Sequence, residues 1–312
     1  MRALLSFVFG GFLFFAGMKL LVWSLRQFSA NRITKHLSKA AGSSWQAILS
    51  GTVATCLMQS SSLITSVTVG MVEAGLCPLT SAIYITMGAN LGSTLIPQIL
   101  ASNLPPLEVF CFITAFIFAV CKKKRLAALA SSLGLLMAGM KIMSVAAAPI
   151  AEHPLFRIML MAMCEKPLLA ILFGAMGAAA LQSSSLVVAT LLVMVRLQVV
   201  PPVIAIAVAL GSNVGTCVTA MLAAVGTGKA AKTVAIFHLV YNSAGVILIY
   251  PWLEPFAGLM AWTAADIARQ VANAHTAFNL FSILAAWPFI PLIFNPKKGT
   301  LQAVANNIGL KH

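Results

Sequence analysis

Apolar runs of about 20 residues recur along this 312-residue chain, and they constrain its fold more than any other feature. A run of that length spans the hydrocarbon core of a bilayer as an α-helix. Only 8% of the residues are charged, whereas a soluble domain carries about 25%. Apolar and polar residues do not alternate over segments of about ten residues, as the strands of a membrane barrel require. The sequence therefore predicts an all-α polytopic membrane protein.

The apolar runs predict seven membrane-spanning helices, and two further stretches have a different pattern. Each of these, at 44–75 and 167–198, consists of two short apolar pieces that are too short to span. They predict helical hairpins that enter the membrane and leave it on the same side. A polar-speckled segment at 149–165 is expected at the membrane interface. The predicted spans are 3–25, 79–100, 107–121, 126–148, 201–225, 232–250 and 273–294.

Polar residues interrupt both predicted hairpins in the same way. Gln59-Ser60-Ser61-Ser62 returns 123 residues later as Gln182-Ser183-Ser184-Ser185. The Gly-rich stretch 88–94 returns at the same offset, and the Ala-Gly-Met-Lys stretch 16–19 returns at an offset of 122. Three landmarks in one order at nearly one offset indicate an internal duplication.

The duplication predicts two repeats of opposite orientation. If the hairpins do not cross the membrane, three spans separate a landmark from its copy. An odd number inverts the second repeat, as in many secondary transporters. The predicted units are a first repeat at 1–121, a second repeat at 126–250, an additional transmembrane helix within 251–294 and a short basic cytoplasmic tail at 295–312.

The basic residues favour this topology. Thirteen of the 20 Lys and Arg residues fall on one predicted side of the membrane and five on the other. Because basic loops are enriched in the cytoplasm, we expect a plasma (inner) membrane protein with its N-terminus outside and its C-terminus cytoplasmic. The formal charge of +14 then reflects topology, and no nucleic-acid partner is expected. The richer side receives Arg26, Arg32, Lys35, Lys39, Lys122, Lys123, Lys124, Arg125, Lys229, Lys232, Lys297, Lys298 and Lys311.

The paired QSSS breaks have the chemistry of an ion site. Broken backbone inside a membrane is tolerated where it lines a cavity or meets protein. The helix after each break points its first N–H groups at it, and these groups with the helix dipole favour an anion. Carbonyl, hydroxyl and amide oxygens at the end of the preceding helix suit sodium. The alternative is that serines let helices pack closely, but their symmetric recurrence favours a site.

A G-x-N-x-G motif follows each hairpin within the next helix. Because glycine costs roughly 1 kcal/mol relative to alanine in a helix, the paired glycines predict an unwound or closely approached turn. Ser212, Thr216 and Thr219 share one helix face and offer three oxygens to a neighbouring site. The motif residues expected to support the site are Gly88, Asn90, Gly92, Gly211, Asn213 and Gly215.

Two His-x-x-x-Asn pairs each place a histidine and an asparagine on one helix face: His238 with Asn242, and His275 with Asn279. Interhelical hydrogen bonding is the favoured interpretation. A role in a pore or in proton transfer is the alternative.

The paired motifs resemble the type II sodium-dependent phosphate cotransporters, a family with bacterial and animal members. The resemblance covers roughly residues 5–290 and implies sodium-coupled symport of inorganic phosphate by alternating access. Sodium is then a co-transported ligand, and no cofactor or other metal is expected. The implied sodium ligands are Gln59, Gln182, Ser183, Ser212, Thr216 and Thr219. The implied phosphate contacts are Ser60, Ser61, Ser62, Ser183, Ser184 and Ser185.

The chain departs from the family pattern at two points. Many bacterial members carry a cytoplasmic PhoU-like helical domain after the membrane part, and we expect this chain to lack one. Cys217 stands where a threonine is common, which bears on ion or substrate preference.

Other functions stand as alternatives to sodium–phosphate symport. An intramembrane hydrolase with a QSSS serine as nucleophile and His238 or His275 as base does not explain the duplication, so no enzyme is expected. A passive anion channel, a transporter of another oxyanion, and a proton-coupled phosphate transporter or exporter all fit the same fold. The sequence leaves the oligomeric state open, with a homodimer as one option.

Overall fold

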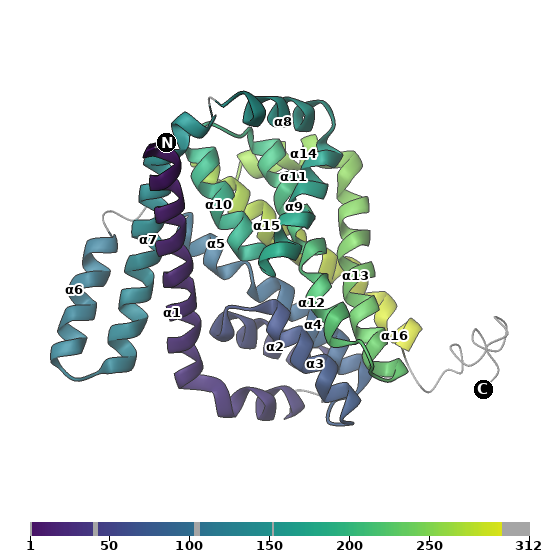
Figure 1. Ribbon diagram of the computed structural model, residues 1–312. Helices are drawn as coiled ribbons and strands as arrows, with labels where there is room; N and C mark the ends of the chain where they lie inside the picture. Colours follow the sequence, from purple (N-terminus) through teal and green to yellow (C-terminus); the bar gives the residue numbers. More distant parts are fainter. Residues whose placement is uncertain (1, 40–42, 103–106, 152, 295–312) are drawn as a thin grey trace.

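The computed structural model describes residues 2–39, 43–102, 107–151 and 153–294, and within these ranges the regular structure is helical (Figure 1). The predicted tail at 295–312 lies outside the described residues. The first half contains α1 (Arg2–Lys39), α2 (Ser44–Met58), α3 (Ser61–Glu73), α4 (Leu79–Gly92), α5 (Leu95–Leu100) and α6 (Leu107–Val120). The second half contains α7 (Lys124–Ala151), α8 (Pro154–Glu165), α9 (Pro167–Leu181), α10 (Ser184–Arg196), α11 (Pro202–Gly215), α12 (Cys217–Ala223), α13 (Lys229–Ile249), α14 (Leu253–Ala261), α15 (Ile267–Ala286) and α16 (Ile290–Phe294).

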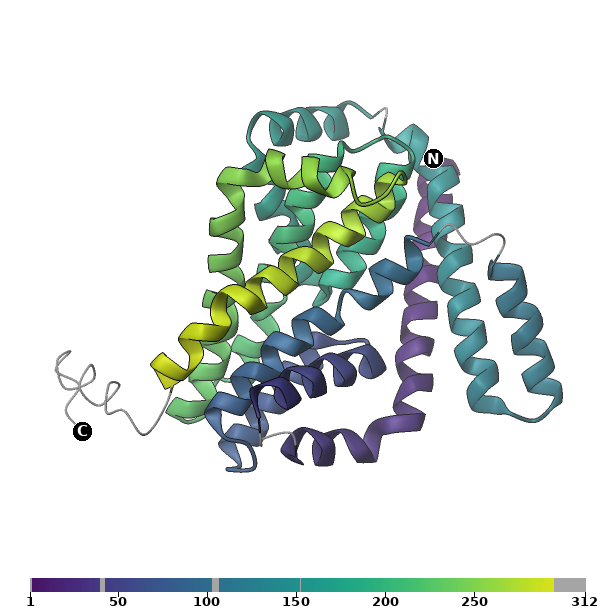
Figure 2. The ribbon, with the colours of Figure 1, turned by 180° about the vertical axis from the view of Figure 1, so that it is seen from behind.

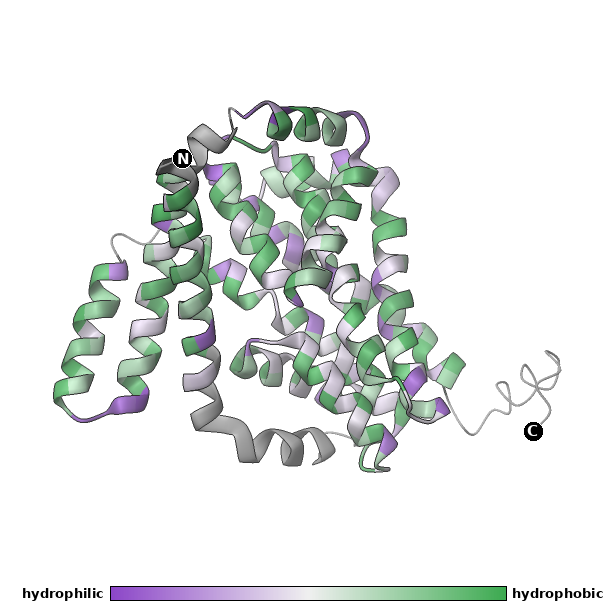
Figure 3. Ribbon diagram, viewed as in Figure 1, coloured by the Kyte–Doolittle hydropathy of each residue, from purple (hydrophilic) through white to green (hydrophobic). Residues whose placement is uncertain are grey.

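Several helices have the length and composition of membrane spans. Four described segments pass on both counts, and a fifth passes if α8 and α9, which meet at 119°, are taken as one bent span. Figure 3 shows hydrophobic residues along the outer helices and hydrophilic residues at the turn between α6 and α7. The all-helical class is therefore confirmed, with several helices that could cross a membrane. The four segments are Lys124–Met143, Pro202–Ala223, Lys229–Ala261 and Ile267–Phe294.

Some predicted helix boundaries differ from the structure. Helix α1 continues to Lys39, so the basic stretch after residue 25 is helical rather than a loop. The segments at 79–100 and 201–225 are each broken in two, at Ser93-Thr94 and at Thr216. Both breaks fall directly after a G-x-N-x-G motif, where glycine weakens the helix.

The offset of 123 recurs in the helices themselves. Helices α2 and α9 begin and end 123 residues apart, and so do α3 and α10, and α4 and α11. Packing follows the same correspondence, because α4 lies on α2 as α11 lies on α9, and α12 contacts α3 as α5 contacts α10. Each half therefore packs the short helix that follows its break, α5 or α12, against the hairpin of the other half.

Glycines set these close crossings. A Cβ on Gly88 would overlap the carbonyl oxygen of Ile48 in α2, and one on Gly211 would overlap that of Ile171 in α9. Gly92 and Gly215, the last glycines of the two motifs, face α2 and α9 in the same way. The predicted close approach at the G-x-N-x-G motifs is therefore confirmed, since backbone meets backbone there.

Helices α1 and α7 form a separate arm that also depends on glycine. A Cβ on Gly17 would lie 2.8 Å from the Leu136 nitrogen, and one on Gly139 would lie 2.6 Å from the Gly10 oxygen. Gly17 and Gly139 belong to the two Ala-Gly-Met-Lys stretches. Helix α6 packs on α7 at the outer side of this arm (Figure 1).

Helices α13 and α15 cover the two halves. Helix α13 packs on α3 and α4, whereas α15 packs on α10 and α11 and crosses the back of the molecule diagonally (Figure 2). A short helix, α14, links them across one end. The two QSSS stretches thus lie inside a frame of longer helices.

Candidate functional site

Each QSSS stretch forms the junction between two short helices, and the two junctions have the same backbone. Gln59 ends α2 in the left-handed region at φ 51°, and Gln182 ends α9 at φ 53°. The next serine is the N-cap of the following helix: Ser60 Oγ accepts from the Leu63 N–H, and Ser183 Oγ accepts from the Leu186 N–H. This left-handed residue followed by a serine cap turns the chain sharply at the break.

The two breaks are in direct contact. Ser62 Oγ donates a hydrogen bond of 3.1 Å to the carbonyl oxygen of Gln182, across 120 residues of sequence. Ser185 Oγ donates one of 2.7 Å to the carbonyl oxygen of Ser93, where α4 ends. Both QSSS stretches and the end of the first G-x-N-x-G motif therefore meet in one place.

The serines at the start of α3 and α10 are buried, whereas one of the two glutamines is exposed at the protein surface. Ser61, Ser62, Ser184 and Ser185 are all buried, whereas Gln182 is exposed. The first N–H groups of a helix lack intrahelical partners, so these positions bring backbone donors to the junction. Such donors, with serine hydroxyls, can bind an anion without a charged side chain.

The three oxygens predicted on the helix of the second motif lie where α11 ends and α12 begins. Ser212, Thr216 and Thr219 each donate their hydroxyl hydrogen to a carbonyl three residues earlier, at 2.6, 2.8 and 2.8 Å. A hydroxyl that donates in this way keeps its lone pairs for a cation. Ser212 and Thr216 are buried, so any ligand they hold would be shielded from water.

Gln59 and Gln182 present different groups to the junction. The Gln59 side-chain amide donates to the carbonyl oxygen of Cys56 within its own helix end. The Gln182 backbone carbonyl is already occupied by Ser62. The two halves are thus alike in sequence and backbone but differ in hydrogen bonding.

The asparagines of the two G-x-N-x-G motifs anchor the covering helices. His238 Nε2 donates to Asn90 Oδ1 over 3.0 Å, and Asn90 donates to Asn242 over 2.7 Å. On the other half, His275 Nε2 lies 3.3 Å from Asn213 Oδ1. All of these side chains are buried. Interhelical hydrogen bonding by the His-x-x-x-Asn pairs is therefore confirmed.

Sequence reasoning missed two parts of this arrangement. The carbonyl of Ser93 as a partner of Ser185 could not be predicted, because it depends on a helix break one residue past the motif. The Asn90 and Asn213 partners were also missed. The sequence did contain a basis for predicting them, because the two His-x-x-x-Asn pairs equal in number the asparagines of the two G-x-N-x-G motifs.

The charged side chains that form ion pairs lie outside the QSSS stretches, and Arg196 is at the far end of α10 from its break. Lys141 Nζ is 2.8 Å from Glu108 Oε1, and Arg196 is 3.5 Å from Asp266. Among the described residues no three His, Cys, Asp or Glu side chains are grouped to hold a metal ion. The junction itself therefore consists of hydroxyls, amides and backbone groups.

Comparison with known proteins identifies the family. The sequence model of the Na+/Pi-cotransporter family matches the chain twice, over residues 13–145 and 135–252. The chain belongs to the Na+/Pi-cotransporter family. Each match contains one QSSS stretch and one G-x-N-x-G motif. This is a family of transporters, which agrees with the expectation of a non-enzymatic membrane protein.

Relatives with similar sequences include bacterial and animal proteins. The chain is 29% identical over 297 residues to "Uncharacterized protein YqeW" of Bacillus subtilis, covering 94% of this chain and 97% of that protein. It is 27% identical over 290 residues to "Putative inorganic phosphate export protein YjbB" of Salmonella typhimurium, covering 89% of this chain and 53% of that protein.

An animal relative matches a shorter part. The human "Sodium-dependent phosphate transport protein 2B" is 33% identical over 128 residues, which are 40% of this chain and 18% of that protein. The chain thus spans about half the length of YjbB and a smaller part of the animal transporter. No solved structure matches the chain.

Proposed function

We propose that this Na+/Pi-cotransporter family member is a secondary active transporter that couples sodium to inorganic phosphate by alternating access. The observation that carries the proposal is the hydrogen bond between Ser62 and the Gln182 carbonyl, which joins the two QSSS breaks. Membership of the family supports phosphate transport. The name of the human relative, a sodium-dependent phosphate transport protein, and the oxygen-rich junction support sodium coupling.

In this mechanism phosphate lies against the N-termini of α3 and α10. Backbone N–H groups would donate to its oxygens, together with those serine hydroxyls whose hydrogen is not already bonded to a carbonyl, and the helix dipoles would favour its negative charge. The residues proposed to meet it are Ser60, Ser61, Ser62, Ser183, Ser184 and Ser185.

Sodium would lie beside the phosphate, where oxygen atoms gather. All of its proposed ligands are neutral side chains. Within such a site the charges of sodium and phosphate would stabilise each other. That mutual stabilisation is the physical basis of coupling, because each ion binds more tightly when the other is present. The proposed ligands are Gln59, Gln182, Ser183, Ser212, Thr216 and Thr219.

We also propose that the two halves have inverted topology and that both QSSS hairpins are re-entrant. The shared 123-residue offset of three helix pairs supports this arrangement. So does Figure 1, in which α8 crosses one end of the molecule and the basic α6–α7 turn lies at the other. The proposed orientation in the plasma membrane has the basic end in the cytoplasm.

Labelled phosphate uptake into proteoliposomes tests the coupling. With an inward sodium gradient we expect concentrative uptake that a matched potassium gradient does not support. Gln59→Ala and Gln182→Ala should abolish it, while Gln46→Ala, an exposed glutamine at the start of α2, should not. Downhill flux that is independent of the cation would contradict coupling and indicate a passive anion channel.

Export of phosphate is the second candidate, because the relative YjbB is named for it and matches 89% of this chain. Loading the proteoliposomes with labelled phosphate and reversing the gradient measures efflux directly. Uptake driven by a proton gradient without sodium would favour proton coupling. If sulfate or arsenate at equal concentration lowers labelled phosphate uptake by much more than half, and is itself taken up, another oxyanion is the better substrate.

A further inference from the structure

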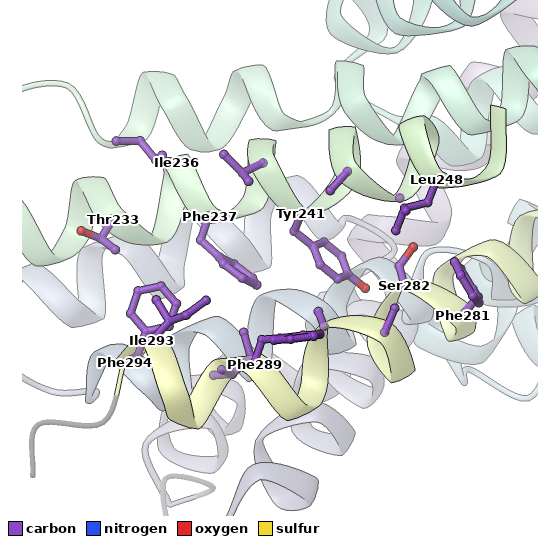
Figure 4. Close-up of a pocket in the computed structure, with 16 residues that line it drawn as sticks. Thr233, Ile236, Phe237, Tyr241, Leu248, Phe281, Ser282, Phe289, Ile293 and Phe294 are labelled. Carbon is purple, nitrogen blue, oxygen red and sulfur yellow. The ribbon is translucent and has the colours of Figure 1, made fainter. Parts of the chain in front are cut away.

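An apolar groove lies between α13 and the end formed by α15 and α16, away from the QSSS breaks. It has a volume of about 460 Å³. Figure 4 shows aromatic rings from both sides along it. The ring-bearing residues that line it are Phe237, Tyr241, Phe281, Phe289 and Phe294.

The groove follows from the packing of its two walls. Gly245 brings α13 close to α15, since a Cβ there would lie 2.7 Å from Ser282 Oγ. At the other end the rings of Phe237 and Phe294 pack edge to face with centroids 6.0 Å apart. Between these contacts the small side chains of Ala244 and Ala285 leave open space.

One end of the groove carries positive charge. Thr233 and Ile236 line it near the start of α13. Lys229 and Lys232 precede them by four residues each, so they lie on the same face of the helix one turn earlier. Both lysines are exposed. The groove therefore runs from a basic end into an apolar interior.

We propose that this groove binds an anionic phospholipid, with an acyl chain between α13 and α15 and the phosphate headgroup on Lys229 and Lys232. From Thr233 to Leu248 the lining covers 15 helical steps, about 22 Å at ~1.5 Å per residue. One leaflet of hydrocarbon is about 15 Å thick, so an acyl chain fits within that length. Basic residues at a membrane surface attract anionic lipids.

The charge distribution favours a lipid over a second copy of the chain. A second copy would need to place a ridge of its own into the groove, and it would bring the same two lysines toward the symmetric interface. A phospholipid matches both features of the site, because its tail is apolar and its headgroup is negative. The inference is independent of the transported ion and of the direction of transport.

Native mass spectrometry of the full chain in detergent tests the proposal, with phosphatidylglycerol and phosphatidylcholine as the probes. For the wild type we expect retention of phosphatidylglycerol about tenfold above phosphatidylcholine. The double variant Lys229→Gln with Lys232→Gln should lose that preference. The matched control is Lys122→Gln with Lys123→Gln, two exposed lysines in the α6–α7 turn, which should keep it.

Variants that fill the groove separate the tail from the headgroup. Ala285→Phe should reduce retention of both lipids, and Ala244→Phe, on the opposite wall, provides a second variant if the first fails to fold. Unchanged retention in a folded groove variant would overturn the proposal. So would loss of the preference in the Lys122 and Lys123 control alone. A change from dimer to monomer in Ala285→Phe, with lipid retention intact, would show instead that the groove joins two copies.

Discussion

Gly88 and Gly211 lie at equivalent crossings, where the helix that carries each G-x-N-x-G motif meets the first arm of a hairpin. The neighbouring group in each case is a backbone carbonyl, which has no flexible end that can move aside. Overpacking usually costs 1–3 kcal/mol. Here the cost falls at the upper end of that range because a whole helix must shift.

We expect Gly88→Ala and Gly211→Ala each to destabilise the protein by about 2–3 kcal/mol or more. Thermal unfolding of the purified protein in detergent measures this. Gly70→Ala is the matched control, since the Cβ would meet no atom within 4 Å, and alanine gains roughly 1 kcal/mol of helix propensity. Equal melting temperatures for Gly88→Ala and Gly70→Ala would contradict the close crossing.

Ser62 joins the two breaks through its hydroxyl alone, so its removal tests the junction. Loss of one neutral hydrogen bond costs about 1 kcal/mol, which corresponds to roughly a fivefold change in an equilibrium constant. We expect Ser62→Ala to raise the phosphate KM about fivefold, because the proposed site loses the hydrogen bond that joins its two breaks. Ser66→Ala, one turn further along α3, should leave KM unchanged. An unaltered KM in Ser62→Ala would remove this serine from the site.

At the scale of helices, His238 and His275 attach two covering helices to the two halves. Asn90 forms hydrogen bonds to α13, and Asn213 forms hydrogen bonds to α15. An apolar side chain at either position could not form them. Polar groups, when left unpaired in a buried site, cost about 1–3 kcal/mol each. The two His-x-x-x-Asn pairs therefore hold both G-x-N-x-G motifs against the covering helices.

Asn90→Ala is expected to lower stability by about 2–4 kcal/mol, because it leaves His238 Nε2 and Asn242 Oδ1 without the partner they share. Its unfolding temperature should fall well below that of Asn273→Ala, a half-buried asparagine of α15. The double variant Asn90→Ala with His238→Ala distinguishes a specific pair from general damage. If the two effects simply add, the pair contributes no coupling and the anchoring role is wrong.

The sequence predicted helices and breaks well where the signal was local. Hydropathy located α6, α7 and α13 to within a few residues, and the QSSS stretches predicted the junctions between α2 and α3 and between α9 and α10. The paired glycines predicted an unwound or closely approached turn, but not that α4 and α11 would end at the last glycine of each motif. Hydropathy carried both predicted spans past this point, because apolar residues resume at Leu95 and Val218.

For the whole molecule, the 123-residue offset indicated the duplication. It did not predict which helices of the two halves contact each other. The His-x-x-x-Asn pairs of α13 and α15 are 37 residues apart, which differs from the offset of the repeats. Only the fold shows that the histidine of each pair bonds the motif asparagine of a different half. The contact between Ser62 and Gln182 likewise depends on how the halves come together.

Two native cysteines test the proposed topology of the whole chain. Cys121 lies at the α6–α7 turn and Cys164 lies near the end of α8, and both are exposed. Among the described residues between them, α7 contains the segment with the length and hydropathy of a span, so the proposed topology places one crossing between the two cysteines. With the basic end in the cytoplasm, Cys164 faces outward and Cys121 faces inward.

A membrane-impermeant maleimide added to intact cells should therefore label the protein through Cys164. Labelling should be lost in Cys164→Ser and retained in Cys121→Ser, whereas permeabilised cells should show labelling of both cysteines in the wild type. The other four cysteines are buried or half-buried and should contribute little. Labelling of both cysteines from outside would place them on one side, and α7 would then not cross. Labelling of Cys121 alone would keep the crossing and reverse the orientation, so the positive-inside assignment would fail while the inverted repeat survived.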